Sequence, residues 1–512
     1  MTIISLSSLP ALSPEVFLLT TLCILLLYAV ISSKSILLRT NYSKENGFAT
    51  LRTPILISNI SYLFVFSLVF VLIFLMNQIE MLSIDNGYYQ NFYIIDRIAA
   101  IGKFVLALAT LIVILISQEY LLEYINVYEY ILLLAFTLLG LFLLVSSNDL
   151  ISFYLALELQ SLASYVLSAL LRTSVFSTEA AVKYFILGAL SSGILLLGGS
   201  LIYGFCGTTN FNDIHLISSN YGIPHIGFLF VYISLLFKLA AVPFHMWAPD
   251  VYEGSATSVT AYFAIVPKFA ILILLVRFSY TVVSHVEISA SILEQVLAFC
   301  AIGSMVLGSI SAIYQRRIKR LFAYSAIAHM GYTLIGFTGI ASGVIGSSAS
   351  IYFYMMLYMI TMLGTFAIIL GCWNRNLRYI TDLKGLYLYN PTLAFVFTVL
   401  LLSLTGVPPL AGFFSKLFIF FTAVQASVYG ILMIAIITSV IGAFYTIRLV
   451  KFIYFNPINT DFIFNITRFT KLPVAKLSGT YNAIFLSISF LIVATFCLYP
   501  YPLLTAITWA TV

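Results

Sequence analysis

Residues 237–254, FKLAAVPFHMWAPDVYEG, place a charge beside a helix break in the interior of a long apolar segment. The segment begins near His225 and carries Lys238, and Pro243 follows that lysine. Because proline lacks a backbone donor and clashes with the preceding turn, the helix must kink or break there. Charge and irregular backbone at membrane depth are tolerated only where protein or a water-filled cavity surrounds them. The stretch is therefore typical of transporters rather than of structural anchors.

The composition around this stretch predicts an all-α polytopic membrane protein. Of the 512 residues, 62% are hydrophobic and only 8% are charged, and the mean hydropathy is +1.08. No soluble core needs so much apolar sequence. No polar stretch is long enough to fold separately, so one integral domain is expected. Apolar runs long enough to span a bilayer occur about 14 times, at 14–33, 54–76, 99–118, 128–147, 150–171, 179–205, 225–248, 256–283, 291–314, 321–341, 346–372, 391–425, 427–455 and 479–508.

A second proline break is expected in the twelfth of these runs, at Pro408 and Pro409. Like the seventh run, which breaks at Pro243, the twelfth carries a lysine close to the break, Lys416. Two such pairs in one chain favour a membrane transporter over a passive anchor.

Basic residues outside the apolar runs predict the orientation of the chain. Even-numbered loops hold Arg97 alone, so by the positive-inside rule the odd loops face the cytoplasm or matrix and both termini face the opposite side. The net charge of +6 is mostly this bias and does not indicate nucleic-acid binding, because no soluble basic face exists to carry it. The basic residues of the odd loops are Lys34, Arg39, Lys44, Arg52, Arg172, Arg316, Arg317, Lys319, Arg320, Arg375, Arg378, Lys384, Arg448, Lys451, Arg468, Lys471 and Lys476.

The charges inside the apolar runs are the candidate functional groups. A charge near the bilayer centre costs roughly 2.5–3.5 kcal/mol on insertion scales, so several in one chain imply a polar interior shielded from lipid. The bases are Lys103, Lys183, Lys238, Lys268, Arg277 and Lys416, and the acid is Glu158.

Three of the bases have simpler explanations than a function. Lys103 lies near the start of its run, where its stem can snorkel to the surface. Arg277, near the end of its run, is expected to be a snorkelling or structural charge. Lys183 follows Glu179 by one turn, and an exposed pair at a helix start explains it as well as a function does.

The remaining charges lie too deep for snorkelling. Lys238, Lys268 and Lys416 fall near the middle of their runs, which favours a function for all three. Glu158 is far from both ends of its run, and an unpaired carboxylate there would take up a proton. It therefore needs a cationic partner or changes protonation as it works, and Lys238 is the partner expected.

Two histidines fall inside or beside these runs. His245 follows the first break, and His329 lies mid-run in FAYSAIAHMGY. Either can be a hydrogen-bonded core residue, the more frequent case, but beside a row of lysines a neutral imidazole can also relay protons between waters. The relay is the interpretation favoured for His329 more than for His245.

The sequence contains none of the short motifs that bind nucleotide or carry electrons. It has no P-loop, dinucleotide fingerprint, paired-histidine haem pattern or nucleophile elbow. Its 5 cysteines are scattered without a CxxC spacing. No cofactor and no metal is therefore expected in this chain.

Five segments, in this order, resemble the antiporter-like membrane subunits of respiratory complex I, and in particular the subunit 2 family, called subunit N in bacteria. They are LALELQSLASYVL, TEAAVKYFILGALSSGILLLGGSLIYG, FKLAAVPFHMWAPDVYEGS, KRLFAYSAIAHMGY and GVPPLAGFFSKLFIF. The similarity runs from about 120 to 455, and HMWAPDVYEGS favours this subunit over its paralogues. It implies a non-redox, proton-translocating subunit of the NADH:ubiquinone oxidoreductase, driven by quinone reduction in other subunits.

The resemblance also implies roles for individual positions. The family's helix-five glutamate matches Glu158, and its helix-six lysine matches Lys183. The lysine of broken helix seven matches Lys238, that of helix eight matches Lys268, and that of broken helix twelve matches Lys416.

These positions suggest a path along a hydrated central axis. A proton is expected to be taken up near Lys238 and Lys268, to pass waters near His329, and to leave by way of Lys416.

The family organisation divides the chain into four parts. Helices 1–3 occupy 1–127, two inverted five-helix repeats with one broken helix each occupy 128–283 and 291–455, and a loop with helix 14 occupies 456–512. The expected partners are the other membrane-arm subunits, including the neighbouring antiporter-like subunit, and lipids. NAD, FMN, iron–sulfur clusters and ubiquinone are expected in other subunits.

The resemblance implies the mitochondrial inner membrane, with both termini on the intermembrane-space side, or alternatively a bacterial plasma membrane. An abundance of Phe (43) and Tyr (34) fits an AT-rich organellar gene. Two other functions stay open: a subunit of an independent cation/proton antiporter, and an inert scaffold, against which the buried lysines argue.

Overall fold

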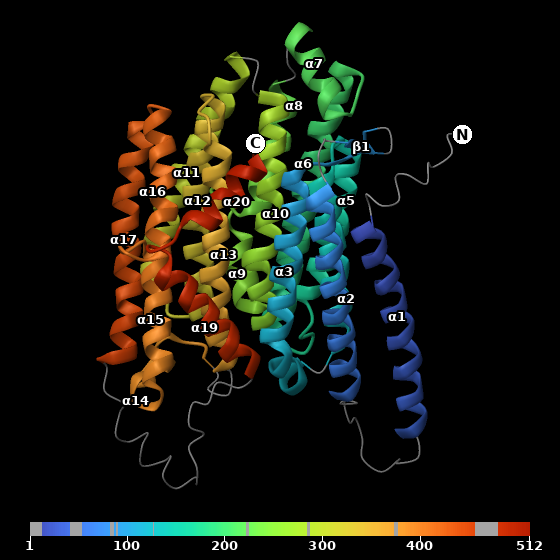
Figure 1. Ribbon diagram of the computed structural model, residues 1–512, viewed down its shortest axis with the longest axis vertical. Coiled ribbons are helices and arrows are strands. Elements are labelled where there is room, and N and C mark those ends of the chain that lie inside the picture. The colour runs from blue at the N-terminus through green and yellow to red at the C-terminus, as the bar shows by residue number, and fades with distance from the viewer. Residues whose placement is uncertain are drawn as a thin grey trace.

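The computed structural model describes residues 13–40, 54–81, 86–88, 91–125, 127–221, 225–283, 287–372, 377–455 and 480–511. Within these ranges ten helices are long and apolar enough to cross a membrane, and they stand side by side in a bundle (Figure 1). They are α1 (Ser13–Thr40), α2 (Pro54–Met81), α3 (Arg97–Tyr120), α4 (Glu129–Ser146), α5 (Leu150–Ser168), α6 (Val175–Cys206), α10 (Thr257–Val283), α11 (Glu287–Tyr314), α13 (Ser347–Gly371) and α17 (Tyr429–Tyr454).

The remaining crossings consist of one further long helix and three interrupted ones. The long helix is α12 (Ile318–Ala341). Together with the ten helices above, α12 and the three interrupted crossings make the fourteen crossings expected, counted over the described residues. The all-α membrane fold is therefore confirmed. The interrupted crossings are α8 (His225–Leu239) with α9 (Trp247–Gly254), α15 (Pro391–Thr405) with α16 (Ala411–Gln425), and α19 (Thr480–Thr495) with α20 (Tyr501–Thr511).

Short helices and one hairpin connect the membrane helices at the ends of the bundle. An antiparallel hairpin of β1 (Asn86–Tyr88) and β2 (Tyr93–Ile95) precedes α3. The short helix α7 (Phe211–Tyr221) stands above the bundle in Figure 1. A π-helical turn, η2 (Leu121–Ile125), follows α3, and η4 (Ile380–Leu383) and α14 (Leu386–Tyr389) precede α15.

Several helix starts follow from local polar residues. Asp149 caps α5 by accepting from the backbone N–H of Ile151 at 2.7 Å, and Asp96 caps α3 through the N–H of Ala99 at 3.1 Å. Each satisfies one of the donors that a helix leaves free in its first turn. The caps fix where helices begin in a chain whose apolar runs alone leave the ends undefined.

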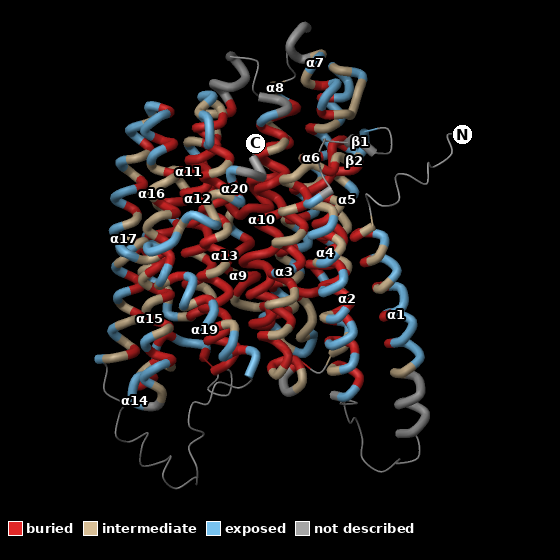
Figure 2. Tube along the Cα trace, viewed as in Figure 1, coloured by how far each residue is buried: buried red, intermediate tan, exposed pale blue. Residues whose placement is uncertain are grey.

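Burial is concentrated on the central helix α10, which carries Lys268. All of its most apolar window is buried inside the protein, against 22% for that of α1. Figure 2 shows the buried residues along the middle of the bundle and exposed ones on the outer helices. Lys268, at 2% exposed, is therefore kept from lipid by the surrounding protein.

The last apolar run, expected as one span over 479–508, is broken by Pro500. After α19 the chain turns, and α20 starts directly after Pro500, because proline interrupts the backbone hydrogen bonds of a helix that runs through it and is best tolerated at a helix start. In Figure 1 the two red helices cross the front of the bundle, and both pack on α13 and α3.

Loops 3, 5, 7, 9 and 11 meet at one end of the bundle, as the charge pattern predicts. One cavity there is lined by residues from all five, among them Tyr120, Ser174, Glu253, Arg317 and Arg378. Which side of the membrane this end faces stays a prediction. The loop residues Lys44, Arg52, Arg375, Arg468, Lys471 and Lys476 lie outside the described residues.

Candidate functional site

The first break follows Lys238 directly. Helix α8 ends at Leu239, and Ala240 takes a left-handed conformation with φ of 60°. The N–H of Ala241 bonds the carbonyl of Leu236 at 3.0 Å, the closure of a Schellman helix end. The indole of Trp247 donates to the carbonyl of Phe237 at 2.9 Å, so α9 holds the end of α8 in place.

Lys238 is buried in this frame, with an exposed fraction of 7%. Its Nζ donates to the hydroxyl of Tyr165 on α5 at 3.2 Å and lies 5.6 Å from the centre of that ring. A phenol oxygen and an aromatic face both stabilise an ammonium without fixing its proton to a carboxylate. The lysine is therefore held by neutral groups, an arrangement that leaves it free to exchange its proton.

Lys268 lies in the interior of α10, directly after Pro267. Because Pro267 has no N–H, the carbonyl of Phe263, four residues earlier, lacks its helical donor. The hydroxyl of Tyr252 donates to that carbonyl at 3.3 Å instead. The Nζ of Lys268 lies 5.6 Å from the centre of the Tyr252 ring. Within the described residues this Nζ has no hydrogen-bond partner, although it carries three donors when charged.

A small cavity joins the first two lysines. It measures about 10 Å³ and is lined by Lys238, Lys268, Gln160 and Tyr184 with several apolar neighbours. That volume is about one water molecule, and the lining offers the polar partners that a buried water needs. The cavity supplies the polar space that the unpartnered Nζ of Lys268 requires.

The second break has the same geometry with a different residue. Helix α15 ends at Thr405, and Gly406 takes the left-handed conformation with φ of 86°. The N–H of Val407 bonds the carbonyl of Leu402 at 3.3 Å. Helix α16 then begins at Ala411, after Pro408 and Pro409. The prolines at both breaks, Pro243 and Pro409, follow cis peptide bonds.

Lys416 bridges this second break. It is 7% exposed, and its Nζ donates to the carbonyl of Thr405 at 2.6 Å and lies 4.9 Å from the centre of the Tyr332 ring. The carbonyl belongs to the last turn of α15, where helical acceptors lack partners. The lysine therefore binds the free end of one half-helix from the start of the other.

His329 stands beside Lys416. Its Nδ1 is hydrogen bonded to the hydroxyl of Tyr354 at 2.5 Å, which leaves Nε2 for another partner. A second cavity of about 10 Å³ is lined by His329, Tyr354, Tyr358, Lys416 and other residues. Again this is the size of one water, so His329 and Lys416 share a polar space.

Two expected site residues lie apart from this row. Glu158 is partly exposed and accepts from Ser161 Oγ at 3.3 Å. The expectation that Glu158 and Lys238 form a direct ion pair is wrong. Lys238 donates to the hydroxyl of Tyr165 instead, and no Glu158–Lys238 pair forms among the described residues.

Lys183 lies nearer the surface, with 42% of its side chain exposed. It pairs with Glu179 at 2.6 Å, the helix-start pair that its spacing allows, and with Asp250 of α9 at 2.8 Å. Neither water-sized cavity includes it. His245, the less favoured of the two relay candidates, is half-buried after the break and lines neither cavity.

Two further charges are structural. Lys103 is not a snorkelling residue, and that expectation is wrong, because it is fully buried and paired with Glu15 of α1. The two lie far apart in sequence, so position within the run gave no sign of the pair. Of the two roles expected for Arg277, the structural one is confirmed. Its guanidinium donates to both carboxylate oxygens of Asp96, at 2.5 and 2.7 Å, and to the carbonyl of Val145 at 2.7 Å.

Sequence reasoning missed the tyrosines that contact the lysines and the histidine. Tyrosine is so common in this chain, at 34 residues, that its presence carries no signal. The spacing of Tyr354 and Tyr358, one helical turn apart, could have placed both on one face. Within the described residues the hydroxyl of Tyr358 is buried without a partner, and its ring lies 5.0 Å from that of His329.

Comparison with known proteins identifies relatives along almost the whole chain. Residues 147–442 match the family described as NADH:quinone oxidoreductase/Mrp antiporter, transmembrane. The chain is 39% identical over 504 residues to the NADH-ubiquinone oxidoreductase chain 2 of Marchantia polymorpha, with 96% of each covered. It is 48% identical over 341 residues to the NADH-quinone oxidoreductase subunit N 1 of Rhizobium meliloti (strain 1021), which covers 65% of this chain and 70% of that protein.

Solved structures show the same fold. Respiratory complex I from Thermus thermophilus contains a chain that superimposes with a TM-score of 0.72 at 27% identity, over 95% of this chain and 99% of that one. A chain of the Mrp complex from Dietzia sp. DQ12-45-1b gives a TM-score of 0.79 at 20% identity, over 98% and 97%. The second likeness shows the fold alone.

Proposed function

Since the chain belongs to the family of NADH-ubiquinone oxidoreductase chain 2 and NADH-quinone oxidoreductase subunit N, we propose that it is a proton-translocating subunit of the membrane arm of such a complex. The observation that carries the proposal is the row of buried bases, Lys238, Lys268, His329 and Lys416, set at two helix breaks with two water-sized cavities among them. Its role is translocation without redox chemistry, driven by quinone reduction in other subunits.

The path runs along this row. One water in the first cavity connects Lys238 to Lys268, and one in the second connects His329 to Lys416. Two tyrosine rings adjoin the row, that of Tyr252 beside Lys268 and that of Tyr358 beside His329. Each base holds a proton at its side-chain nitrogen, and the proton passes to the next when the charge of its neighbour changes.

The membrane potential sets the free energy that each proton transfer must supply. Moving one charge against 100 mV takes about 2.3 kcal/mol. The hydrogen bond from Lys416 to the Thr405 carbonyl is of the charged kind, whose net value is about 1.5–3 kcal/mol. Making and breaking that one bond across the second break is therefore enough to shift a proton by one step.

Glu158 fits a contact with a neighbouring subunit. It lies in a stripe of α5 whose other members, Ile151, Leu155, Leu162 and Val166, are each at least half exposed. A carboxylate facing lipid is costly, so this stripe packs against another membrane-arm subunit, where Glu158 finds its cation. The partners proposed are the neighbouring antiporter-like subunits and lipid.

A second candidate is a subunit of an independent cation/proton antiporter. The Mrp likeness favours it at the level of the fold, whereas relatives over nearly the full length of the chain favour the oxidoreductase. A native gel of solubilised membranes separates the two. Co-migration of this chain with NADH dehydrogenase activity supports the oxidoreductase, and a separate band without it supports the antiporter.

The test of translocation is Lys416→Ala in the assembled complex, reconstituted in vesicles. Removing an expensive buried charge leaves the helix intact, so we expect normal assembly and NADH oxidation coupled to about 100-fold less proton pumping. Lys451→Ala, an exposed lysine of α17, is the matched control. Full pumping by a Lys416→Ala complex would remove this residue from the path.

A further inference from the structure

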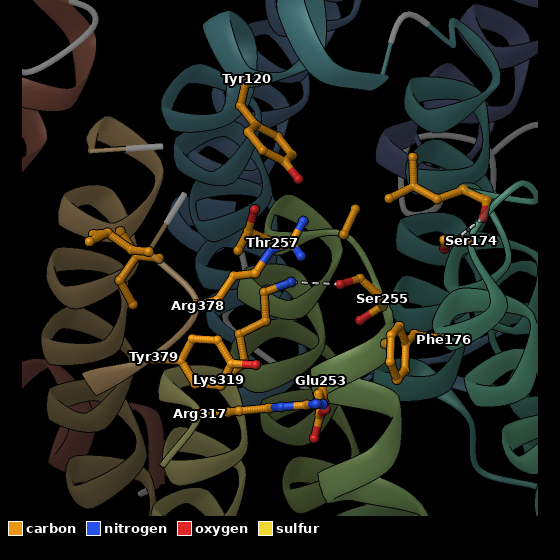
Figure 3. A pocket seen from close by; sticks show the side chains of 15 residues that line it. Tyr120, Ser174, Phe176, Glu253, Ser255, Thr257, Arg317, Lys319, Arg378 and Tyr379 are labelled. Carbon is orange, nitrogen blue, oxygen red and sulfur yellow. Dashed lines mark hydrogen bonds and ion pairs between the residues drawn. The ribbon is translucent and has the colours of Figure 1, made fainter. Parts of the chain in front are cut away.

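A cavity of about 330 Å³ opens at the end of the bundle where the odd-numbered loops meet. It shares no lining residue with the two water-sized cavities at the row of buried bases. Figure 3 shows its lining, with Arg317, Lys319 and Arg378 on one side and Ser174 and Phe176 on the other. Nothing in the translocation path uses it.

The lining carries more positive than negative charge. Arg317 is paired with Glu253, which also binds Arg320 at 3.4 Å, so that carboxylate is fully used. Lys319 donates to the backbone carbonyl of Ser255 at 2.8 Å, a neutral partner. The guanidinium of Arg378 has no ion pair or hydrogen bond among the residues that the structure describes.

The two uncompensated charges lie close together. In Figure 3 the charged ends of Arg378 and Lys319 point into the same part of the cavity, beside Thr257. Burial, and after it the charge of Arg378, lowers the pKa of Lys319 to about 7, so an anion bound beside it would favour the charged form. Like charges held together at a half-open site repel each other, and an anion between them removes the repulsion. The hydroxyl of Thr257 lies at the same space and can supply a neutral donor.

The position of the cavity selects the kind of anion. It sits where α12 and α10 begin, at Ile318 and Thr257, so the positive ends of two helix dipoles face it. A fork-shaped guanidinium with an ammonium and hydroxyls is the donor set that phosphate prefers. Phe176, which lines the cavity, is 62% exposed, and its neighbour Val175 is 76% exposed, so an apolar edge adjoins the basic residues.

We propose that this cavity binds the phosphate group of an acidic phospholipid, with Arg378 and Lys319 on the phosphate oxygens and Phe176 against the start of an acyl chain. Basic pockets between transmembrane helices at the cytoplasmic or matrix side are sites where anionic headgroups bind. Inorganic phosphate shares the headgroup chemistry but makes no use of the apolar edge.

The test is lipid retention by the purified complex, measured by native mass spectrometry after titration with short-chain phosphatidylglycerol. Arg378→Gln removes a guanidinium that has no partner among the described residues, so it should fold normally and bind the lipid about tenfold more weakly than the wild type. Arg172→Gln is the matched control, because Arg172 is an exposed arginine of the same end that does not line the cavity. It should bind as the wild type does.

Parallel titrations with phosphatidylcholine and inorganic phosphate identify the source of the anion. We expect weaker binding of both than of phosphatidylglycerol, and a loss with Phe176→Ser for the lipid only. Equal retention of phosphatidylglycerol by Arg378→Gln and the wild type would overturn the proposal. If inorganic phosphate displaces phosphatidylglycerol at equal concentration, the proposal of a phospholipid ligand is overturned and the site is assigned to the free anion.

Discussion

Lys238 precedes its helix break, in the last turn of α8, whereas Lys416 follows its break, in the second turn of α16. Lys416 nevertheless reaches back to the carbonyl of Thr405, the last residue of α15. Both lysines therefore lie at the C-terminal end of the half-helix before the break, where free carbonyls and the helix dipole favour a cation. The comparison indicates that the end of the first half-helix, rather than the position of the lysine in sequence, defines the site.

The two breaks differ in how the backbone turns. Both close with the same Schellman pattern, but the left-handed residue is Ala240 in the first and Gly406 in the second. A left-handed conformation costs an alanine about 1–2 kcal/mol and a glycine almost nothing. The first break thus carries strain that the second lacks. In the second, the glycine also leaves room for the lysine stem, since a Cβ on Gly406 would lie 3.0 Å from Lys416 Cδ.

The largest effect is expected where the second break packs most closely. A Cβ on Gly412 would lie 1.7 Å from the carbonyl oxygen of Ser403, a backbone atom that cannot move away without displacing α15. Gly412→Ala should therefore abolish assembly of the subunit or leave a complex without pumping. Gly430→Ala is the control, because a Cβ there meets nothing within 4 Å.

Blue-native electrophoresis with in-gel NADH oxidation gives the assembly readout, and vesicle acidification gives pumping. Assembly and pumping at wild-type levels in Gly412→Ala would show that α15 and α16 are not held at the contact that defines the second break. A loss in both glycine variants alike would point to a general intolerance of alanine rather than to this contact.

A smaller effect should separate the two left-handed residues. Ala240→Gly relieves the strained conformation, and we expect it to stabilise the protein by about 1 kcal/mol with pumping retained. Gly406→Ala imposes the same conformation on a Cβ and presses on Lys416, so it should lose about 1–2 kcal/mol of stability and most of the pumping. Thermal unfolding of the purified complex, followed by the fluorescence of a thiol dye, measures the difference.

Ala435→Gly, at a buried position in the interior of α17, is the control for the first of these changes. It should destabilise the protein by about 1 kcal/mol, as glycine does within a helix. Ala240→Gly that behaves like Ala435→Gly would mean that Ala240 is not strained. Gly406→Ala that keeps full pumping would mean that Lys416 has other room.

Sequence reasoning recovered the features that depend on single residues and failed where distant helices meet. The lysines at the two breaks and the fourteen crossings could be predicted, because proline, charge and hydrophobic length act locally. The pairing of Lys103 with Glu15 could not, since it joins α3 to α1. Nor could the hydrogen bond from Lys238 to Tyr165, because it depends on how α5 packs against α8.

The smallest effect concerns Glu158, the carboxylate expected to act with Lys238 at the first break; no acid lines the cavity at the second break among the described residues. A double-mutant cycle of Glu158→Gln with Lys238→Met, read out as pumping rates at equal assembly, measures their coupling free energy. Since Tyr165 rather than Glu158 bonds the lysine, we expect about 0.5–1 kcal/mol, well below the 3–5 kcal/mol of a broken buried ion pair. The same cycle with Lys416→Met should be additive, because Lys416 lies at the other break. A coupling near 3 kcal/mol with Lys238 would show that the two close into a direct pair during turnover, and equal coupling with both lysines would assign Glu158 to the whole row rather than to the first break.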